Sequence, residues 1–469
     1  MPPTGTVQND VKNDVQEIQH TPSESQNFLH RIHRSITAIL EGNKPKSNIA
    51  VLDSVRAIAI LIVVFYHLDF HLHVNGLPWV GPYLDAAIST GSSGVTLFLV
   101  LSGFLLFLPY IRSLLFDNAW PSVKQFYLRR ALRIMPAYYI SLFLLIILTN
   151  QKYLRPDHFK DLVLFLTFLM DSATSTYQRI NTPFWTLAVE WQFYMILPWL
   201  ALAMRPLVQR GSLKRRVWML ISCVGGVIIW GIASRFGGYF VTTINTGITL
   251  GLPPTIFKAI VALLYGIGGR GPHGKFLEDF GAGMVVAVCY IMAHYSVVQG
   301  KWNTVLRRIS PWLLVGSILW LYIIALWSTQ TSMPASSNPI IAFIYNDTVI
   351  WTFSEFGFAL GYGSLMLAVL FSGSFVKRIF EWSPFRWIGL ISFSMYIWHR
   401  PLLYPFLDAE TSALSGWGIL KLFCLGVAWI VIAIIPFSFG NFALIERPFM
   451  KFSDSLRQKK AQPAKHSPA

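Results

Sequence analysis

Apolar residues in this chain are grouped in long runs, and short polar and basic segments separate one run from the next. Three clear examples are 49–70, 131–149 and 417–439. Each has about the 20 residues that a helix needs to cross the roughly 30 Å hydrocarbon layer of a bilayer. The pattern therefore predicts an all-α fold, a polytopic transmembrane helical bundle, rather than a soluble domain with a single anchor.

The same pattern predicts about ten membrane spans. They lie at 50–70, 93–111, 132–150, 184–204, 217–236, 280–298, 311–328, 349–371, 387–406 and 418–440. Two further apolar stretches, 161–170 and 255–269, are too short or too interrupted by Gly and Pro to count as spans. The distribution of charge requires an even number of spans between residues 216 and 301, so we expect 255–269 to be interfacial or re-entrant.

Composition and charge agree with a membrane protein. Of the 469 residues, 54% are hydrophobic and only 13% are charged, whereas soluble proteins carry about 25% charged residues. The formal net charge is +16, and Lys and Arg gather beside the apolar runs, for example in 205–216 and 451–465. Basic residues mark the cytoplasmic ends of spans, so this charge indicates topology and contact with anionic lipid rather than nucleic-acid binding. Because 71–90 carries no Lys or Arg, we expect both termini in the cytoplasm.

Three regions are expected along the chain. Residues 1–48 form a polar cytoplasmic tail with a short amphipathic helix, 49–445 form the membrane domain, and 446–469 form a basic cytoplasmic tail. The apolar positions of 28–40 recur at helical spacing, which fits a helix on the membrane surface or an ordinary soluble helix. No internal repeat is evident, so an inverted-repeat transporter gains no support. The expected location is the plasma (cytoplasmic) membrane.

Three polar side chains interrupt the first apolar run, which reads LDSVRAIAILIVVFYH. Positions 56 and 67 are about three helical turns apart, so Arg56 and His67 share one face of the helix, and Asp53 lies one turn before Arg56. Ionisable residues inside a span are costly and usually mark function. We expect this face to point into the bundle.

His67 has three interpretations. It is a residue at the outer end of a span, a general base that takes a proton from a hydroxyl, or a metal ligand together with His71. The metal interpretation is the weakest, because the glutamate of a zinc-hydrolase helix is missing. No metal site is expected.

Two arginines begin the third predicted span in FYLRRALRIMPAYY. Arg130 and Arg133 are spaced i, i+3 on one helix face, while Arg129 points about 100° away. They are either ordinary topology signals or a phosphate site, since the planar guanidinium binds phosphate oxygens in bidentate fashion.

Glu190 lies deep in the aromatic segment FWTLAVEWQFYMILP. A lone buried carboxylate is expensive, so we expect it to meet a histidine or an arginine of another helix, in a structural or a catalytic pair. Gly103 and Ser102 are small enough to allow close approach of another helix. His399, in SFSMYIWHRP, is expected to anchor a span at the interface rather than to act as a second base.

Six stretches together resemble the acyltransferase-3 family of integral membrane acyltransferases, which includes O-antigen acetylases. In chain order they are LDSVRAIAILIVVFYH, FLVLSGFLLF, YLRRALRIMPAYY, FWTLAVEWQFY, IGLISFSMYIWHRPL and IERPF. The resemblance implies a core of about ten spans, with 49–445 as the acyltransferase domain. By position it implies His67 as the catalytic histidine and Arg130 and Arg133 as ligands of the acyl donor. Arg56 and Glu190 match the membrane arginine and glutamate, and we assign them to catalysis too.

The function that the resemblance implies is O-acylation. We expect a membrane-bound enzyme that moves an acyl group, most simply acetyl, from acyl-CoA to a carbohydrate hydroxyl, with His67 as general base. The donor substrate is then acetyl-CoA, the acceptor is a carbohydrate or a glycosylated molecule, and no cofactor is permanently bound. Two alternatives stay open: a transporter or flippase of a glycan or lipid intermediate, and a different membrane acyltransferase in which His399 is the base.

Overall fold

The computed structural model describes most of the membrane domain, a short piece of the N-terminal tail and most of the C-terminal tail. The described residues are 34–40, 50–72, 82–243, 253–265, 274–294, 299–329, 338–413 and 418–461. The chain divides into two units, Met1–Pro45 and Lys46–Ala469. In the first unit a helix covers 34–40, which is part of the predicted amphipathic helix; the rest of that prediction lies outside the described residues.

The second unit is built from helices, and none of its described residues forms a strand. In chain order, its first helices are α2 (Val51–Leu72), α3 (Pro82–Ser89), α4 (Gly94–Phe116), α5 (Val123–Thr149), α6 (Phe159–Leu166), α7 (Phe184–Val208), α8 (Leu213–Thr243) and α9 (Pro254–Tyr265). They are followed by α10 (Leu277–His294), α11 (Gln299–Ser328), α12 (Pro339–Ile344), α13 (Asp347–Leu370), α14 (Ser374–Phe380), α15 (Ser383–Leu390), α16 (Ser392–Ala413), α17 (Ile419–Trp429), α18 (Ile435–Asn441) and α19 (Arg447–Ala461).

The polytopic helical bundle is confirmed. Within the described residues, nine helices are long and apolar enough to cross a membrane: 51–72, 83–116, 123–149, 184–208, 213–238, 277–294, 300–328, 347–370 and 419–456. Each of them contains or overlaps one predicted span. The last is continuous because π-helical turns, Ile430–Ile434 and Phe442–Glu446, join α17 to α18 and α18 to α19.

The remaining predicted span, 387–406, corresponds to the end of α15 and most of α16. Helix α16 has 22 residues and contains Pro401 and Pro405, and it is too polar to belong to the nine. The helices found in the two doubtful apolar stretches, 161–170 and 255–269, are too short to be membrane spans. Helix α6 has 8 residues and α9 has 12, both well short of the roughly 20 that a span needs.

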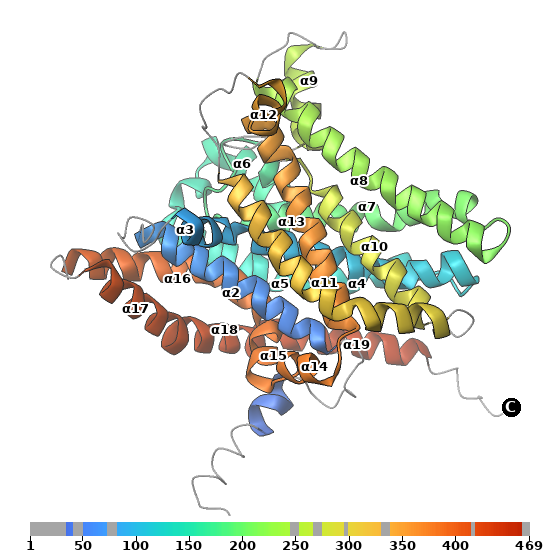
Figure 1. Cartoon of the computed structure of the whole chain (residues 1–469). Helices are drawn as coiled ribbons and strands as arrows, with labels where there is room; N and C mark the ends of the chain where they lie inside the picture. Colours follow the sequence, from blue (N-terminus) through green and yellow to red (C-terminus); the bar gives the residue numbers. More distant parts are fainter. Residues whose placement is uncertain are drawn as a thin grey trace, which may run out of the picture. The chain divides into compact units, whose positions relative to one another are not determined.

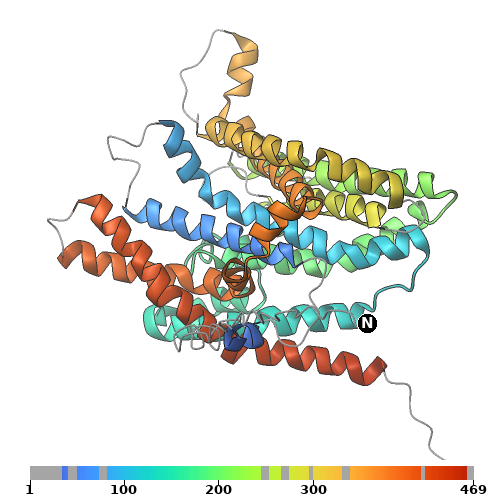
Figure 2. The same cartoon turned by 60° about the horizontal axis from the view of Figure 1, so that its bottom comes forward.

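Helix α2 lies in the middle of the helices that carry the candidate residues. It packs against α4, α15 and α16, and Figure 1 shows it in blue between α16 and the pair formed by α11 and α13. Figure 2, turned so that the bottom of the first view comes forward, shows α2 and α4 running next to each other. This position gives the polar face of α2 neighbours on several sides.

The most extensive helix pairing joins α4 to α10, and glycines make it possible. A Cβ atom on Gly103 of α4 would overlap the backbone carbonyl of Phe280 on α10, and one on Gly283 of α10 would overlap the carbonyl of Val100. Small residues let two helix backbones approach this closely in a membrane. The predicted close approach at Gly103 is confirmed.

We predict that Gly103→Ala and Gly283→Ala each lower the stability of the folded protein by about 1–3 kcal/mol, because the added methyl group separates α4 from α10. Gly226→Ala in α8 is the matched control, since open space surrounds that position. It should be neutral or stabilising, because alanine favours a helix by about 1 kcal/mol over glycine. Thermal unfolding in detergent measures all three, and equal Tm values for the three variants would contradict the close contact.

Candidate functional site

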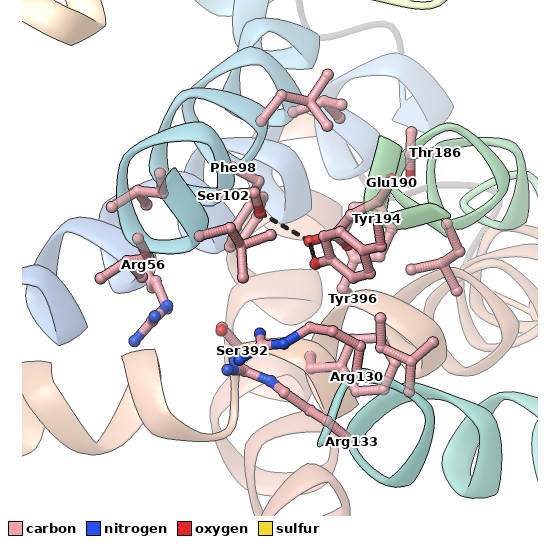
Figure 3. Close-up of a pocket in the computed structure, with 18 residues that line it drawn as sticks. Arg56, Phe98, Ser102, Arg130, Arg133, Thr186, Glu190, Tyr194, Ser392 and Tyr396 are labelled. Atoms are coloured by element: carbon pink, nitrogen blue, oxygen red, sulfur yellow. Dashed lines mark hydrogen bonds between the residues drawn. The ribbon is translucent and has the colours of Figure 1, made fainter. Parts of the chain in front are cut away.

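Two cavities open among these helices, and each holds part of the residue set singled out from the sequence. The first, which we call the arginine cavity, lies between α2, α4, α5, α7 and α16. Its polar lining residues are Arg56, Ser102, Arg130, Arg133, Thr186, Glu190, Tyr194, Ser392 and Tyr396. It is narrow, with a volume of about 80 Å³. Residues from five separate helices therefore meet around one small space (Figure 3).

Three guanidinium groups give the arginine cavity its charge. Arg130 and Arg133 reach it from one face of α5, as their spacing predicted, and Figure 3 shows both guanidinium groups directed into the cavity. Arg56 reaches it from α2, where its Nη1 lies 2.7 Å from Oδ1 of Asp53. Among the described residues no carboxylate forms an ion pair with Arg130 or Arg133. Two cations without a direct ion-pair partner favour an anionic ligand.

Glu190 lies across the arginine cavity from these cations. It accepts hydrogen bonds from the hydroxyl of Ser102, at 2.7 Å, and from that of Tyr194. Its direct partners are therefore hydroxyl groups rather than the histidine or arginine that we expected. The guanidinium carbon of Arg130 lies 5.9 Å from the centre of the Tyr194 ring, so the tyrosine lies next to both the carboxylate and a cation. Ser102, expected only to pack, is a hydrogen-bond donor here.

His67 lines the second cavity, which we call the histidine cavity. This cavity has a volume of about 500 Å³ and also receives Tyr177, Arg235, Glu355, Arg400 and Tyr404. The Nδ1 atom of His67 lies 3.1 Å from the hydroxyl oxygen of Tyr404. When Nδ1–H donates to that oxygen, Nε2 is unprotonated and can accept a proton. Tyr404 is therefore placed to fix the orientation of the imidazole ring.

A second histidine lies beside the first. The ring centres of His67 and His399 are 5.1 Å apart, and His399 is completely buried. Its Nδ1 lies within 3.1 Å of the backbone carbonyls of Met395 and Tyr396, while its Nε2 has no partner among the described residues. The prediction that His399 anchors a span at the interface was wrong, because α16 turns this side chain toward α2 rather than toward the membrane surface.

The two cavities meet at Tyr396. Both are lined by Tyr396 and Val95, and the hydroxyl of Tyr396 lies 2.6 Å from that of Thr186. Arg56 and His67 share α2, so the cation of one cavity and the histidine of the other are about 16 Å apart along the helix axis. Neither Arg56 nor Glu190 lines the histidine cavity. The sequence-derived residues are therefore divided between two adjoining spaces rather than gathered in one.

Sequence reasoning missed a buried ion pair in the wall of the histidine cavity. The Nε atom of Arg235 in α8 donates to Oε1 of Glu278 in α10 at 2.7 Å, and both side chains are at most 2% exposed. Asp279 beside them is also buried. The signal was present, because Arg235 interrupts the apolar run 217–236 just as Arg56 interrupts the first run. No group of three or more His, Cys, Asp or Glu among the described residues is arranged to hold a metal ion.

We predict that Glu278→Gln destabilises the protein by about 3–5 kcal/mol, because it leaves the Arg235 guanidinium buried without its counter-charge. The measurement is the Tm in detergent together with the yield of monodisperse protein. Glu381→Gln removes a carboxylate that is exposed and serves as the control, with an expected change below about 0.5 kcal/mol. Equal Tm values for the two variants would mean that the buried ion pair does not stabilise the fold.

Comparison with known proteins places this chain in a family. The family model of the acyltransferase domain matches residues 49–438. The chain is 25% identical over 376 residues to the peptidoglycan O-acetyltransferase OatA of Listeria monocytogenes, which is 75% of this chain and 49% of that protein. It is 23% identical over 371 residues to the putative peptidoglycan O-acetyltransferase YrhL of Bacillus subtilis, 75% of this chain and 48% of that one.

A putative O-acetyltransferase of Staphylococcus aureus (strain COL) is 22% identical over 372 residues, which is 74% of this chain and 49% of that protein. The chain thus spans about half the length of these relatives. No solved structure matches it. Since the family model covers nearly the whole membrane domain, the resemblance seen in the six stretches is confirmed: this chain belongs to the acyltransferase-3 family.

Proposed function

We propose that this protein is a membrane-bound O-acyltransferase that moves an acetyl group from acetyl-CoA to a carbohydrate hydroxyl. One observation supports this more than any other: a cationic cavity and a histidine cavity adjoin at Tyr396 inside one helical bundle. The first suits a phosphate-bearing donor, and the second suits an acceptor that must lose a proton. The relatives named as O-acetyltransferases support acetyl as the group transferred.

In this proposal the donor binds at the arginine cavity. Arg130 and Arg133 bind the phosphates of coenzyme A, because two guanidinium forks without carboxylate partners match two phosphate groups. The cavity is too small for the nucleotide, with a volume of about 80 Å³. In this proposal only the phosphates at the two arginines and the extended pantetheine arm with its thioester enter the cavity, while the adenosine stays outside. Arg56 and Glu190 line the path of that arm, and we place them with the donor.

The transfer itself takes place beside His67. The unprotonated Nε2 of His67 accepts the proton of the acceptor hydroxyl as its oxygen attacks the thioester carbonyl. A tetrahedral intermediate forms and then collapses, so that the carbon–sulfur bond breaks and the coenzyme A thiolate leaves. The proton on His67 returns to the thiolate, which leaves free thiol, an acetyl ester and a neutral histidine. Tyr404 keeps Nδ1 engaged throughout and so fixes the position of the imidazole.

Topology gives this reaction a direction. Arg130 and Arg133 lie near the start of α5, at the end of the span that the basic segments assign to the cytoplasm. His67 lies near the C-terminal end of α2, about 16 Å along the helix axis from Arg56. The donor therefore enters from the cytoplasm, and the acceptor is modified toward the outer side of the plasma membrane.

We predict that Arg130→Ala and Arg133→Ala each raise the apparent KM for acetyl-CoA about tenfold or more, because each removes a charge-assisted hydrogen bond to phosphate. The assay follows free coenzyme A thiol released by purified protein in detergent. Arg129→Ala is the matched control: it lies in the same helix, does not line the cavity, and its Nε donates to the backbone carbonyl of Gln125. Unchanged KM values in the first two variants would remove the phosphate site from the proposal.

We further predict that His67→Ala abolishes thiol release, whereas Tyr404→Phe lowers kcat and leaves the KM for acetyl-CoA unchanged. The reason is that His67 takes the proton, whereas Tyr404 only orients the imidazole ring of His67. The variant His399→Ala tests the second histidine, whose Nδ1 lies against backbone carbonyls. Full activity of His67→Ala combined with inactivity of a folded His399→Ala would transfer the role of base to His399.

A further inference from the structure

The histidine cavity has walls that suit a sugar. Its volume of about 500 Å³ lies within the range of roughly 300–1,000 Å³ typical of small-molecule sites. Trp185, Trp351, Tyr66 and Tyr404 present aromatic rings to it from separate segments. The C–H bonds of a sugar ring pack well against the electron-rich face of an aromatic ring. A flat, hydroxylated ligand is therefore better matched to this space than an alkyl chain.

Arg400 gives the same cavity a positive charge that no described residue pairs with directly. It lines the cavity from α16, and its guanidinium carbon lies 4.7 Å from the centre of the Tyr404 ring. Its Nε is buried without a hydrogen-bond partner, and no carboxylate of the described residues forms an ion pair with it. Stacking on the ring orients the guanidinium, and the buried Nε–H remains as a donor for a ligand.

Of the two other charged residues that line the cavity, Arg235 pairs with Glu278. Glu355, on the wall formed by α13, accepts a hydrogen bond from Thr96 at 3.0 Å. Arg400 and Glu355 thus approach the cavity from different helices, one with an unused Nε–H donor and one with a carboxylate that can accept from hydroxyl groups. A ligand that satisfies both carries an anionic group at one point and hydroxyl groups at another.

We propose that the histidine cavity is a binding site for a sugar acid, with the sugar's carboxylate held in bidentate fashion by Arg400. This inference rests on the proposed function, because it identifies the acceptor class of the same enzyme. A neutral sugar would leave Arg400 unpaired in an apolar bundle, whereas a carboxylate balances it. Arg400 follows His399 in sequence and shares the cavity with His67. A carboxylate bound there fixes the sugar ring close to the base.

The test is equilibrium dialysis of the purified full-length protein in detergent, with no donor present. The probes are 4-nitrophenyl β-D-glucuronide, its methyl ester, and 4-nitrophenyl β-D-glucoside. The first carries a carboxylate, and the other two have similar shape without the charge. We expect the glucuronide to bind about tenfold more tightly than either neutral probe, and the preference to shrink as salt is raised.

Variants locate the preference. Arg400→Gln should reduce it to less than about twofold, whereas Arg400→Lys should retain part of it, because a point charge remains without the planar fork. Arg378→Gln removes an exposed arginine of α14 and should bind like the wild type. If Arg400→Gln fails to fold, the comparison of the glucuronide with its methyl ester on the wild type still decides the question.

Equal binding of the three probes, or no binding of any of them, would overturn the proposal. So would a preference for the glucuronide that survives in folded Arg400→Gln. Because dialysis contains no acetyl-CoA, its result is independent of catalysis. Preferential binding by a protein that releases no thiol would refute the proposed function alone, and thiol release without a carboxylate preference would refute this inference alone.

Discussion

A charge inside an apolar bundle needs either an opposite charge or a polar space beside it, and this need governs the arrangement of the whole membrane domain. Helix α2 shows it most clearly. Its polar face is satisfied by Asp53 for Arg56 and by Tyr404 for His67. To supply Tyr404, α16 must pack on α2 from a distant part of the chain. The buried pair of Arg235 and Glu278 imposes the same requirement on α8 and α10.

The charges left without partners define the sites. Among the described residues, no carboxylate forms an ion pair with Arg130 or Arg133 in one cavity or with Arg400 in the other. Leaving a cation uncompensated costs free energy that a ligand with the opposite charge can recover. In the proposed reaction the donor brings phosphates and the acceptor brings a carboxylate, so each substrate supplies an anion to the arginines of its own cavity. Binding of the two is thereby kept separate although the cavities share Tyr396.

Much of this could be predicted from the sequence because it depends on local spacing. The length of the apolar runs gave the spans, and the helical period put Arg56 with His67 and Arg130 with Arg133 on common faces. What failed depends on contacts between distant segments. Tyr404 follows His67 by 337 residues, and no local rule joins them. For the same reason the burial of His399 and the hydroxyl partners of Glu190 became visible only in the folded bundle.

The glycine contact between α4 and α10 has a consequence for motion. Helix α4 contributes Ser102 to the arginine cavity and Val95 to both cavities, while Gly103 holds it against α10 with no room for a methyl group. Interiors packed this closely do not deform gradually. The α4 wall is therefore a rigid wall common to both cavities. Any widening of the cavities has to come from the opposite walls, chiefly α5, α7 and α16.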